Sequence, residues 1–379
     1  MAAVDRDELV RRGIVDPSAP DADEIALFAR HLLDRGASLG QLERAVAAVR
    51  AGGDARMRVL GAVSADLNLR GQGPRLTLAQ AAERHGVDLD TARRVWRTLG
   101  FAEPSPDDAA VSEQEAELFA LFGSLSMLEP ETAFQLLRVV GTSVARIADA
   151  AVATLRLAFE VPLLSSGVPY IEVADAYAEL TETLMPQTVR AVDVIMRRNI
   201  ALAAEQQWET DAEGSSTTAR LVVGFADMVG YTAMARSLPT RDLVATIGTF
   251  EREVVDVVTD HGGRVVKLIG DEVMFVLPDP AGACRLALAL AAEFADHPVV
   301  PPLRVGLATG EVLTRDGDYY GRVVNAASRL VELAEPGGVV VSDGVRERLD
   351  DAFATEALPP TRVKGYDEPV QAFRLRAPG

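Results

Sequence analysis

The chain has 379 residues and a formal net charge of -18, a length that is sufficient for roughly two or three domains with buried cores. The acidic balance disfavours nonspecific attraction to nucleic acid or to anionic lipid. No apolar stretch reaches the roughly 18 to 20 residues of a membrane span and the start lacks a signal-peptide core, so we expect a cytoplasmic protein without a membrane span.

The first part of the chain, residues 1–206, is predicted to be an all-helical domain. Apolar residues recur at helical spacing, for example Leu118, Leu121 and Leu125, and alternation typical of strands is scarce. Glycine and proline clusters divide several short helices. These breaks fall at residues 52–53, 71–74 and 103–108 and at a loop bracketed by Pro162 and Pro169.

The stretch LTLAQAAERHGVDLDTARRVWRTLGF resembles a helix-turn-helix of the MerR-like type, with helices at residues 78–85 and 89–99 around Gly86. Arg93, Arg94 and Arg97 belong to the second helix. DNA binding is one interpretation, and a helical pair used only for packing is the other. Acidic neighbours at positions 103, 107 and 108 and the negative net charge oppose DNA, so DNA is not an expected partner.

A helix is predicted over residues 186–206, with Val189, Val192, Ile195 and Met196 on one side. Polar residues, WETDAEGSSTT, follow it and are typical of a linker, which we place at residues 207–219. The helix could carry conformational information to the next domain, or it could simply pack. The sequence leaves both interpretations open.

From residue 220 to 379 strands and helices alternate, which predicts an α/β or α+β domain built on one sheet. Cys284 lies in an apolar helix, and as a lone cysteine it is expected to be a core residue. Strands are expected at residues 221–225, 303–308 and 338–342, in a hairpin at 263–277 that turns at 269–271, and in a last pair at 361–375. Helices are expected at residues 238–260, 281–294, 323–333 and 345–350.

Two aspartates stand where strands end in this second domain. Asp227 follows the apolar run LVVGF and precedes a turn that opens a helix, where backbone N–H groups can hold a phosphate. Asp271 lies at the tip of the hairpin VVKLIGDEVMF, after Gly270, which permits unusual backbone geometry. Carboxylates from neighbouring strand ends suit Mg²⁺ or Mn²⁺ bound with substrate phosphates. Taken alone, both features are common in structures without a metal.

The strings FADMVGYT, VVKLIGDEVMF, RVGLATGEV, GDYYGRVVNAASRL and VKGYDEPVQAFRL occur in the order and spacing of the class III adenylate cyclase catalytic domain, which this part of the chain resembles. The resemblance implies an α+β fold in which the all-helical domain precedes a ferredoxin-like, palm-type sheet covered by helices. It also implies that two catalytic domains pair head to tail in a homodimer with shared active sites, and that a monomer is inactive. The implied reaction converts ATP to cyclic AMP and pyrophosphate.

The resemblance assigns roles to single residues. Asp227 and Asp271, with the backbone carbonyl of Met228, match the ligands of two divalent cations, Mg²⁺ or Mn²⁺. Lys267 and Asp318 match the pair that recognises the base. This is physically sensible because adenine offers an acceptor at N1 and a donor at its 6-amino group. Guanine reverses both demands, so ATP is favoured over GTP, and guanylate cyclase activity is the competing interpretation.

Asn325 and Arg329 are four residues apart and so lie on one face of a helix. They match the family's pair that orients the ribose and steadies charge on the reacting phosphate. Arg304 and Lys364 match positions that contact the triphosphate. The implied mechanism is in-line attack of the ribose 3'-oxygen on the α-phosphorus, with pyrophosphate leaving.

The arrangement of a helical domain, a linker helix and a cyclase domain resembles soluble adenylate cyclases of mycobacteria and other actinobacteria, in which the N-terminal domain regulates and pH can be the signal. We therefore hypothesise that residues 1–206 restrain the catalytic dimer. His31 and His85 titrate in the useful range, although both can also be ordinary helix residues. The competing interpretation from another class is a DNA-binding regulator whose cyclase-like domain only binds a nucleotide.

Overall fold

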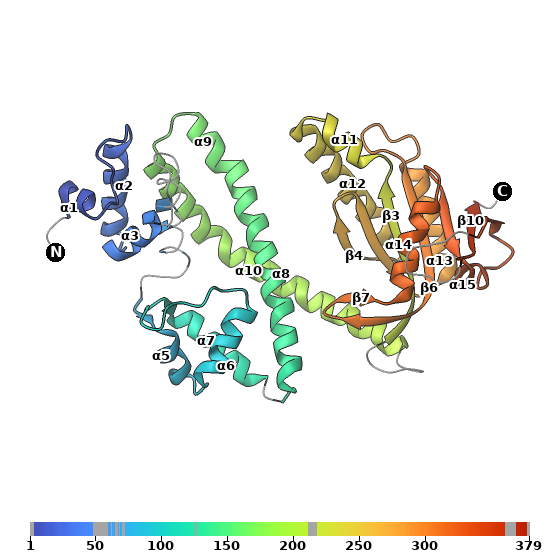
Figure 1. The fold of residues 1–379 in the computed structure, drawn as a ribbon, viewed down its shortest axis with the longest axis horizontal. Coiled ribbons are helices and arrows are strands. Elements are labelled where there is room, and N and C mark those ends of the chain that lie inside the picture. Colours follow the sequence, from blue (N-terminus) through green and yellow to red (C-terminus); the bar gives the residue numbers. More distant parts are fainter. Residues whose placement is uncertain are drawn as a thin grey trace. The chain divides into compact units, whose positions relative to one another are not determined.

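The computed structural model describes residues 4–47, 60–61, 63–64, 67, 69, 73–125, 127–210, 218–360 and 369–376. The chain divides into two compact units, Met1–Ile200 and Ala201–Gly379, and each is described by itself (Figure 1). No helix in these ranges is long and apolar enough to cross a membrane.

The first unit is helical, as predicted, apart from one short antiparallel ribbon, β1 (Arg75–Leu76) with β2 (Val111–Ser112). Its last helix, α10 (Tyr170–Thr210), continues into the second unit. The other helices are α1 (Arg6–Arg11), α2 (Ala22–Asp34), α3 (Leu39–Ala47), α5 (Leu78–Arg84), α6 (Leu89–Thr98), α7 (Glu113–Ser124), α8 (Pro130–Leu155), the π-helix η1 (Arg156–Glu160) and α9 (Val161–Ser165).

Two apolar clusters hold this unit together. In α2, Ile25, Phe28 and Leu32 recur at helical spacing and are fully buried in the first cluster. The second cluster joins α5, α6 and α7 to α8, with Trp96 and Phe119 at its centre. The clusters bury the apolar faces of helices such as α2 and α6, and such burial is the main source of helix stability in a folded protein.

The helix-turn-helix prediction is correct in its helices, since α5 and α6 occur as expected. The arginines of α6 are engaged with acids. Arg93 lies 3.0 Å from Glu103, and Arg94 lies 2.5 Å from Glu131. Arg97 Nε donates to Glu103 at 2.8 Å. These guanidinium groups are therefore already neutralised by carboxylates of the same unit, which supports the packing interpretation over phosphate binding.

The loop expected between Pro162 and Pro169 is shorter than predicted, because α9 extends to Ser165 and only residues 166–169 are irregular. Pro162 lies in the first turn of α9, and the helical path runs on from α8 through η1 into α9. A proline lacks the N–H that an α-helix would use, and the wide π turn just before it accommodates that missing hydrogen bond. The helix predicted at residues 186–206 is likewise part of the longer α10, with Pro186 inside it.

The second unit has one mixed sheet covered by helices, as the predicted fold class requires. The strand order is β4-β5-β3-β6-β8-β10-β9, β7 pairs with β6, and β6 and β8 are parallel. The strands are β3 (Thr218–Met228), β4 (Arg264–Ile269), β5 (Glu272–Leu277), β6 (Leu303–Arg315), β7 (Asp318–Tyr320), β8 (Val339–Ser342), β9 (Ala354–Ala357) and β10 (Ala372–Arg376). The helices are α11 (Tyr231–Ser237), α12 (Thr240–Asp260), α13 (Pro280–Glu293), α14 (Arg322–Leu333) and α15 (Asp343–Arg346).

The two faces of this sheet carry different helices. Val222 and Ala226 of β3 face a core made with α12 and α13, while Val223 and Phe225 face a core made with α14. Figure 1 shows α14 and β7 beside β6. We call the side covered by α14 and β7 the α14 face. Gly306 lets α14 approach closely, because a Cβ there would lie 2.5 Å from the Ala327 carbonyl oxygen.

Several boundaries differ from the prediction. Strand β3 extends through Met228, and the helix expected at 238–260 begins at Thr240 after the separate α11. The helix expected at 345–350 is the short α15 instead. Of the last strand pair expected at 361–375, β10 is present, its partners are β8 and β9, and residues 361–368 lie outside the described residues. Strand β7 was not predicted. Cys284 is buried in the core as expected, and burial raises its pKa to about 12.

Candidate active site

Asp227 and Asp271 lie side by side at one end of the sheet. Asp227 is the residue before the last in β3, and Asp271 occupies the β4–β5 turn, where Gly270 has a φ of 66°. The Met228 N–H donates to the Asp271 carbonyl oxygen at 3.1 Å, which ties the turn to the end of β3. The local fold thus brings together two carboxylates that the sequence separates by more than forty positions.

Two further charged residues flank Asp227. In the sheet register it stands opposite Glu272 on β5 and opposite Arg304 on β6. Residues directly opposite each other project to the same side of a sheet, and for these the side is the α14 face, because Val223 and Phe225 precede Asp227 at steps of two. Glu272 was not singled out from the sequence, although an acid directly after Asp271 was a visible signal.

The acids are poorly neutralised by the protein. Partial burial, and then the Asp271 carboxylate, raise the pKa of Asp227 to about 6, while Arg304 opposes the shift. Burial, followed by the charges of Asp227 and Asp271, raises the pKa of Glu272 to about 7, and Lys267 opposes that shift. Raised carboxyl pKa values mean that negative charge is costly here. A bound cation would relieve this cost.

The donor set fits a cation that is completed by a substrate. The described ranges hold no group of three or more histidine, cysteine, aspartate or glutamate side chains arranged as a full metal site. Mg²⁺ usually binds through one or two carboxylates together with water and substrate phosphates, rather than in a cage made only of protein. Asp227 and Asp271 supply that number of hard oxygen ligands, and Met228, whose carbonyl is the third predicted ligand, directly follows Asp227 in the chain.

Lys267 and Asp318 also meet. The Lys267 ammonium donates to Asp318 Oδ2 at 2.5 Å, joining β4 to β7. The other carboxylate oxygen, Oδ1, accepts the backbone N–H of Tyr319 at 2.8 Å. Lys267 stands opposite Met274, which belongs to the core under α14. This donor and acceptor therefore lie on the same α14 face as Asp227.

The other predicted site residues make no hydrogen bond or ion pair with one another among the residues that the structure describes. Asn325 is exposed on α14, and Arg329 pairs with Glu332 at 2.7 Å rather than with another predicted site residue. The Nε of Arg304 is buried, with no hydrogen-bond partner among the residues that the structure describes. A buried unpaired donor invites an anionic partner. Lys364 lies outside the described residues, so its predicted contact with triphosphate stays a prediction.

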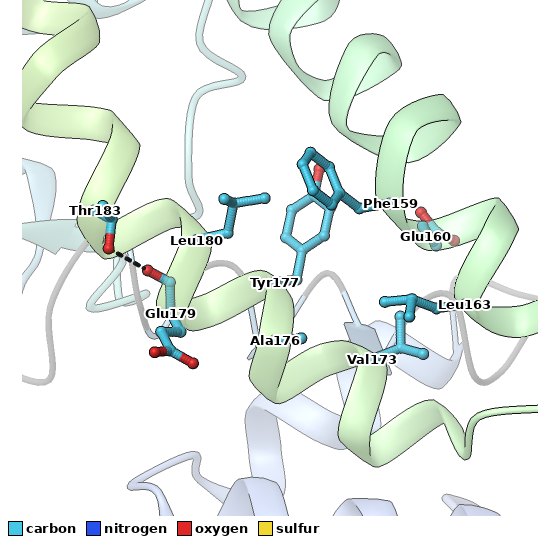
Figure 2. A pocket seen from close by; sticks show the side chains of 9 residues that line it. All are labelled: Phe159, Glu160, Leu163, Val173, Ala176, Tyr177, Glu179, Leu180 and Thr183. Atoms are coloured by element: carbon cyan, nitrogen blue, oxygen red, sulfur yellow. Dashed lines mark hydrogen bonds between the residues drawn. The ribbon is translucent and has the colours of Figure 1, made fainter.

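A separate hollow of about 310 Å³ lies in the first unit, between η1, α9 and α10 (Figure 2). Phe159, Leu163 and Leu180 give it a mainly apolar lining. Burial, and then the Glu160 carboxylate, raise the pKa of Tyr177 on its wall. None of the predicted catalytic or metal-binding residues lines this hollow, so the chemistry is expected in the second unit.

Comparisons with known proteins assign both halves of the chain. A family described as the adenylate cyclase regulatory domain matches residues 13–202, and the adenylate and guanylate cyclase catalytic domain matches residues 215–377. An uncharacterized protein of Mycobacterium tuberculosis is 33% identical over 98% of this chain and 94% of its own length. An adenylate cyclase of Streptomyces coelicolor is 32% identical, covering 80% of this chain and 81% of that protein. A pH-sensitive adenylate cyclase of M. tuberculosis is 28% identical, covering 80% of this chain and 79% of that protein.

Proposed function

Because the chain belongs to the adenylate cyclase family that joins a regulatory domain to a cyclase catalytic domain, we propose that it converts ATP to 3',5'-cyclic AMP and pyrophosphate. We assign residues 1–206 to the regulatory domain, 207–219 to the linker and 220–379 to the catalytic domain. The observation that carries the proposed activity is the Lys267–Asp318 pair, on the sheet face that also carries Asp227 and Arg304. The residues for adenine recognition and those for phosphate chemistry therefore lie on one face of the sheet, where two paired copies can complete each other's sites.

The Lys267–Asp318 pair supplies the hydrogen bonds that select the base. The ammonium donates to adenine N1 and the carboxylate accepts from the 6-amino group. The two groups satisfy each other at 2.5 Å, and ATP would replace this ion pair with two hydrogen bonds of its own. Guanine presents a donor at N1 and an acceptor at O6, and either mismatch leaves a polar group unpaired at a cost of about 1 to 3 kcal/mol.

Asp227 and Asp271, with the Met228 carbonyl, would hold two divalent cations, Mg²⁺ or Mn²⁺. When bound, these ions withdraw charge from the phosphates and make the ribose 3'-hydroxyl more acidic. Asn325 orients the ribose, and Arg329 stabilises negative charge on the reacting phosphate. Arg304, whose Nε lacks a hydrogen-bond partner among the described residues, and Lys364 bind the triphosphate. No side chain has to act as the general base, since the proton can go to water or to the substrate.

The active sites are shared between two copies of the chain. Asp227 and Asp271 of one copy would act with Lys267, Asp318, Asn325 and Arg329 of its partner, so a symmetric dimer has two complete sites. Within one chain Arg329 pairs with Glu332 at 2.7 Å, and this local pairing is compatible with a role for Arg329 in the partner's site. Exposed apolar side chains on α10 support pairing in the first unit as well, because Val189, Ile195 and Met196 are 60%, 59% and 54% exposed in the single chain.

The choice of base is tested by incubating the full-length chain with Mn²⁺ and either ATP or GTP. We expect cyclic AMP and pyrophosphate from ATP, with a rate for GTP that is at least about tenfold lower, which corresponds to about 1.4 kcal/mol of discrimination. Equal rates would make the chain a cyclase of mixed specificity. A chain that binds ATP but releases no pyrophosphate would be a nucleotide-binding regulator.

The regulatory domain restrains the catalytic dimer and responds to pH. A candidate contact lies within the first unit, where His31 Nε2 is 2.9 Å from Asp175 on α10 and Arg35 reaches the same carboxylate at 3.0 Å. A chain that starts near Asp211 should therefore form cyclic AMP faster than the full-length chain and with a flatter dependence on pH. Matching rate profiles from pH 5.5 to 8.5 would contradict the restraint.

A further inference from the structure

Next to the Lys267–Asp318 pair, β4 and β7 share a second contact. The Arg264 guanidinium donates a hydrogen bond from Nη2 to the Tyr319 hydroxyl. The same guanidinium carbon lies 5.3 Å from the centre of the tyrosine ring, within range of a cation–π interaction. Tyr319 is 8% exposed and packs in the core under α14. Two neighbouring residues of β7 are thus each held by a basic residue of β4.

A β-bulge makes this double contact possible. Strand β4 shifts register between Val265 and Lys267, so Arg264 stands opposite Val276 and Lys267 stands opposite Met274. Val276 and Met274 both face the core under α14. In a regular strand, residues three apart point to opposite faces. The extra residue, Val266, instead places both cations on the α14 face.

The orientation of Asp318 depends on the residue that follows it. Asp318 Oδ1 is held by the backbone N–H of Tyr319 at 2.8 Å, and only Oδ2 is held by Lys267. Strand β7 has three residues and hydrogen-bonds to β6 alone among the strands of this sheet. The ladder to β6 holds its peptide groups on one side, and on the side towards β4 the buried Tyr319 ring and its hydrogen bond from Arg264 hold the strand in place. The Lys267–Asp318 pair, with side chains 35% and 25% exposed, is a weak anchor by itself.

We propose that Arg264 and Tyr319 are positioning residues that fix the Asp318 carboxylate and thereby set the preference for adenine over guanine. This role rests on the proposed adenylate cyclase function. A carboxylate held in one orientation presents an acceptor where the 6-amino group arrives. Once Tyr319 is released, the carboxylate can turn, and the cost of placing a guanine there falls. Neither residue has to touch the nucleotide.

The test compares kcat/KM for ATP with kcat/KM for GTP in wild type, Arg264→Ala, Tyr319→Phe and the double variant. Tyr319→Phe keeps the buried ring and removes only the hydroxyl. We expect the ATP-to-GTP ratio to fall about tenfold in Arg264→Ala and about threefold in Tyr319→Phe, mainly through a higher KM for ATP. Both substitutions break the same contact, so the ATP-to-GTP ratio of the double variant should be no lower than that of Arg264→Ala.

Arg346→Ala is the matched control. Arg346 lies over the ring of Phe373 at 4.8 Å and pairs with Asp343 at 3.1 Å, so its loss removes the same type of contact elsewhere in the same unit. Its ATP-to-GTP ratio should equal that of wild type. An unchanged ratio in Arg264→Ala, or an equal fall in Arg346→Ala, would overturn the positioning role. If wild type forms no cyclic AMP, the proposed function itself fails, and the positioning role fails with it.

Discussion

Replacing Asp227 with asparagine is expected to lower the rate of cyclic AMP formation by about 10³-fold, because the substitution removes one of the two carboxylates that hold the catalytic cations. The shape of the side chain is kept, so the change is one of charge. Asp256→Asn is a suitable control, since Asp256 is exposed on α12, and it should leave the rate unchanged. A variant that keeps more than about a tenth of the wild-type rate would remove Asp227 from the metal site.

The same substitution should stabilise the metal-free protein at high pH. The folded pKa of Asp227 is about 6, above the ordinary value of 3.8. A carboxyl group with a raised pKa favours folding below its unfolded pKa, and this contribution is lost as the pH rises towards the folded value. Asparagine carries no charge at any pH. Metal-free Asp227→Asn should therefore have a higher Tm than wild type at pH 8, with a smaller difference at pH 5.

Mn²⁺ provides the complementary measurement on the same two proteins. A ligand that binds only the folded state raises its stability by about 2.7 kcal/mol at a hundredfold excess over Kd. Mn²⁺ should therefore raise the Tm of wild type clearly and that of Asp227→Asn little. A variant that is inactive and also less stable than wild type at pH 8 would indicate general damage to the fold, and the assignment of Asp227 would lose its support.

The general architecture could be predicted because its signals are local. Apolar residues at helical spacing marked α12, α13 and α14, and the hairpin with Gly270 at its turn was visible as two apolar runs around a glycine. Asp227 and Asp271 were paired through the resemblance to the class III cyclase domain, because a strand end and a glycine turn are each common in structures without a metal. Their contact then required only that β3 and β5 be neighbours, which they are.

Other features depend on long-range packing. The bulge at Val266 reflects how β4 aligns with β5, and nothing in the β4 sequence alone requires it. Glu272 gains its raised pKa from burial against Asp227, which is known only once the register is fixed. Strand β7 did have a local sequence signal, the dipeptide Asp316-Gly317, which is typical of a two-residue hairpin turn. Both residues have the positive φ that such a turn requires. A strand of three residues is too short for its alternation to show.

In α9 and α10, by contrast, a local signal was given too much weight, because proline was taken to end a helix. Pro162 and Pro169 predicted a loop between them, but only the stretch just before Tyr170 is irregular, since α9 extends to Ser165. Proline is tolerated in the first turn of a helix, so its presence marks a change in helical geometry and does not always end the helix. Pro186 lies in the interior of α10, where a proline removes a backbone hydrogen bond, and the helix nevertheless continues past it.

Mixing Asp227→Asn with Asn325→Ala tests most directly whether two copies of this chain share active sites. Each variant alone has a defect in both sites of its dimer and should be inactive. In a mixed dimer, one site carries both defects and the other carries none. Random exchange makes about half of the dimers mixed, so about one quarter of the wild-type activity should return. No recovery from dimers verified to be mixed would contradict shared sites, and full activity of either variant alone would contradict the assigned chemistry.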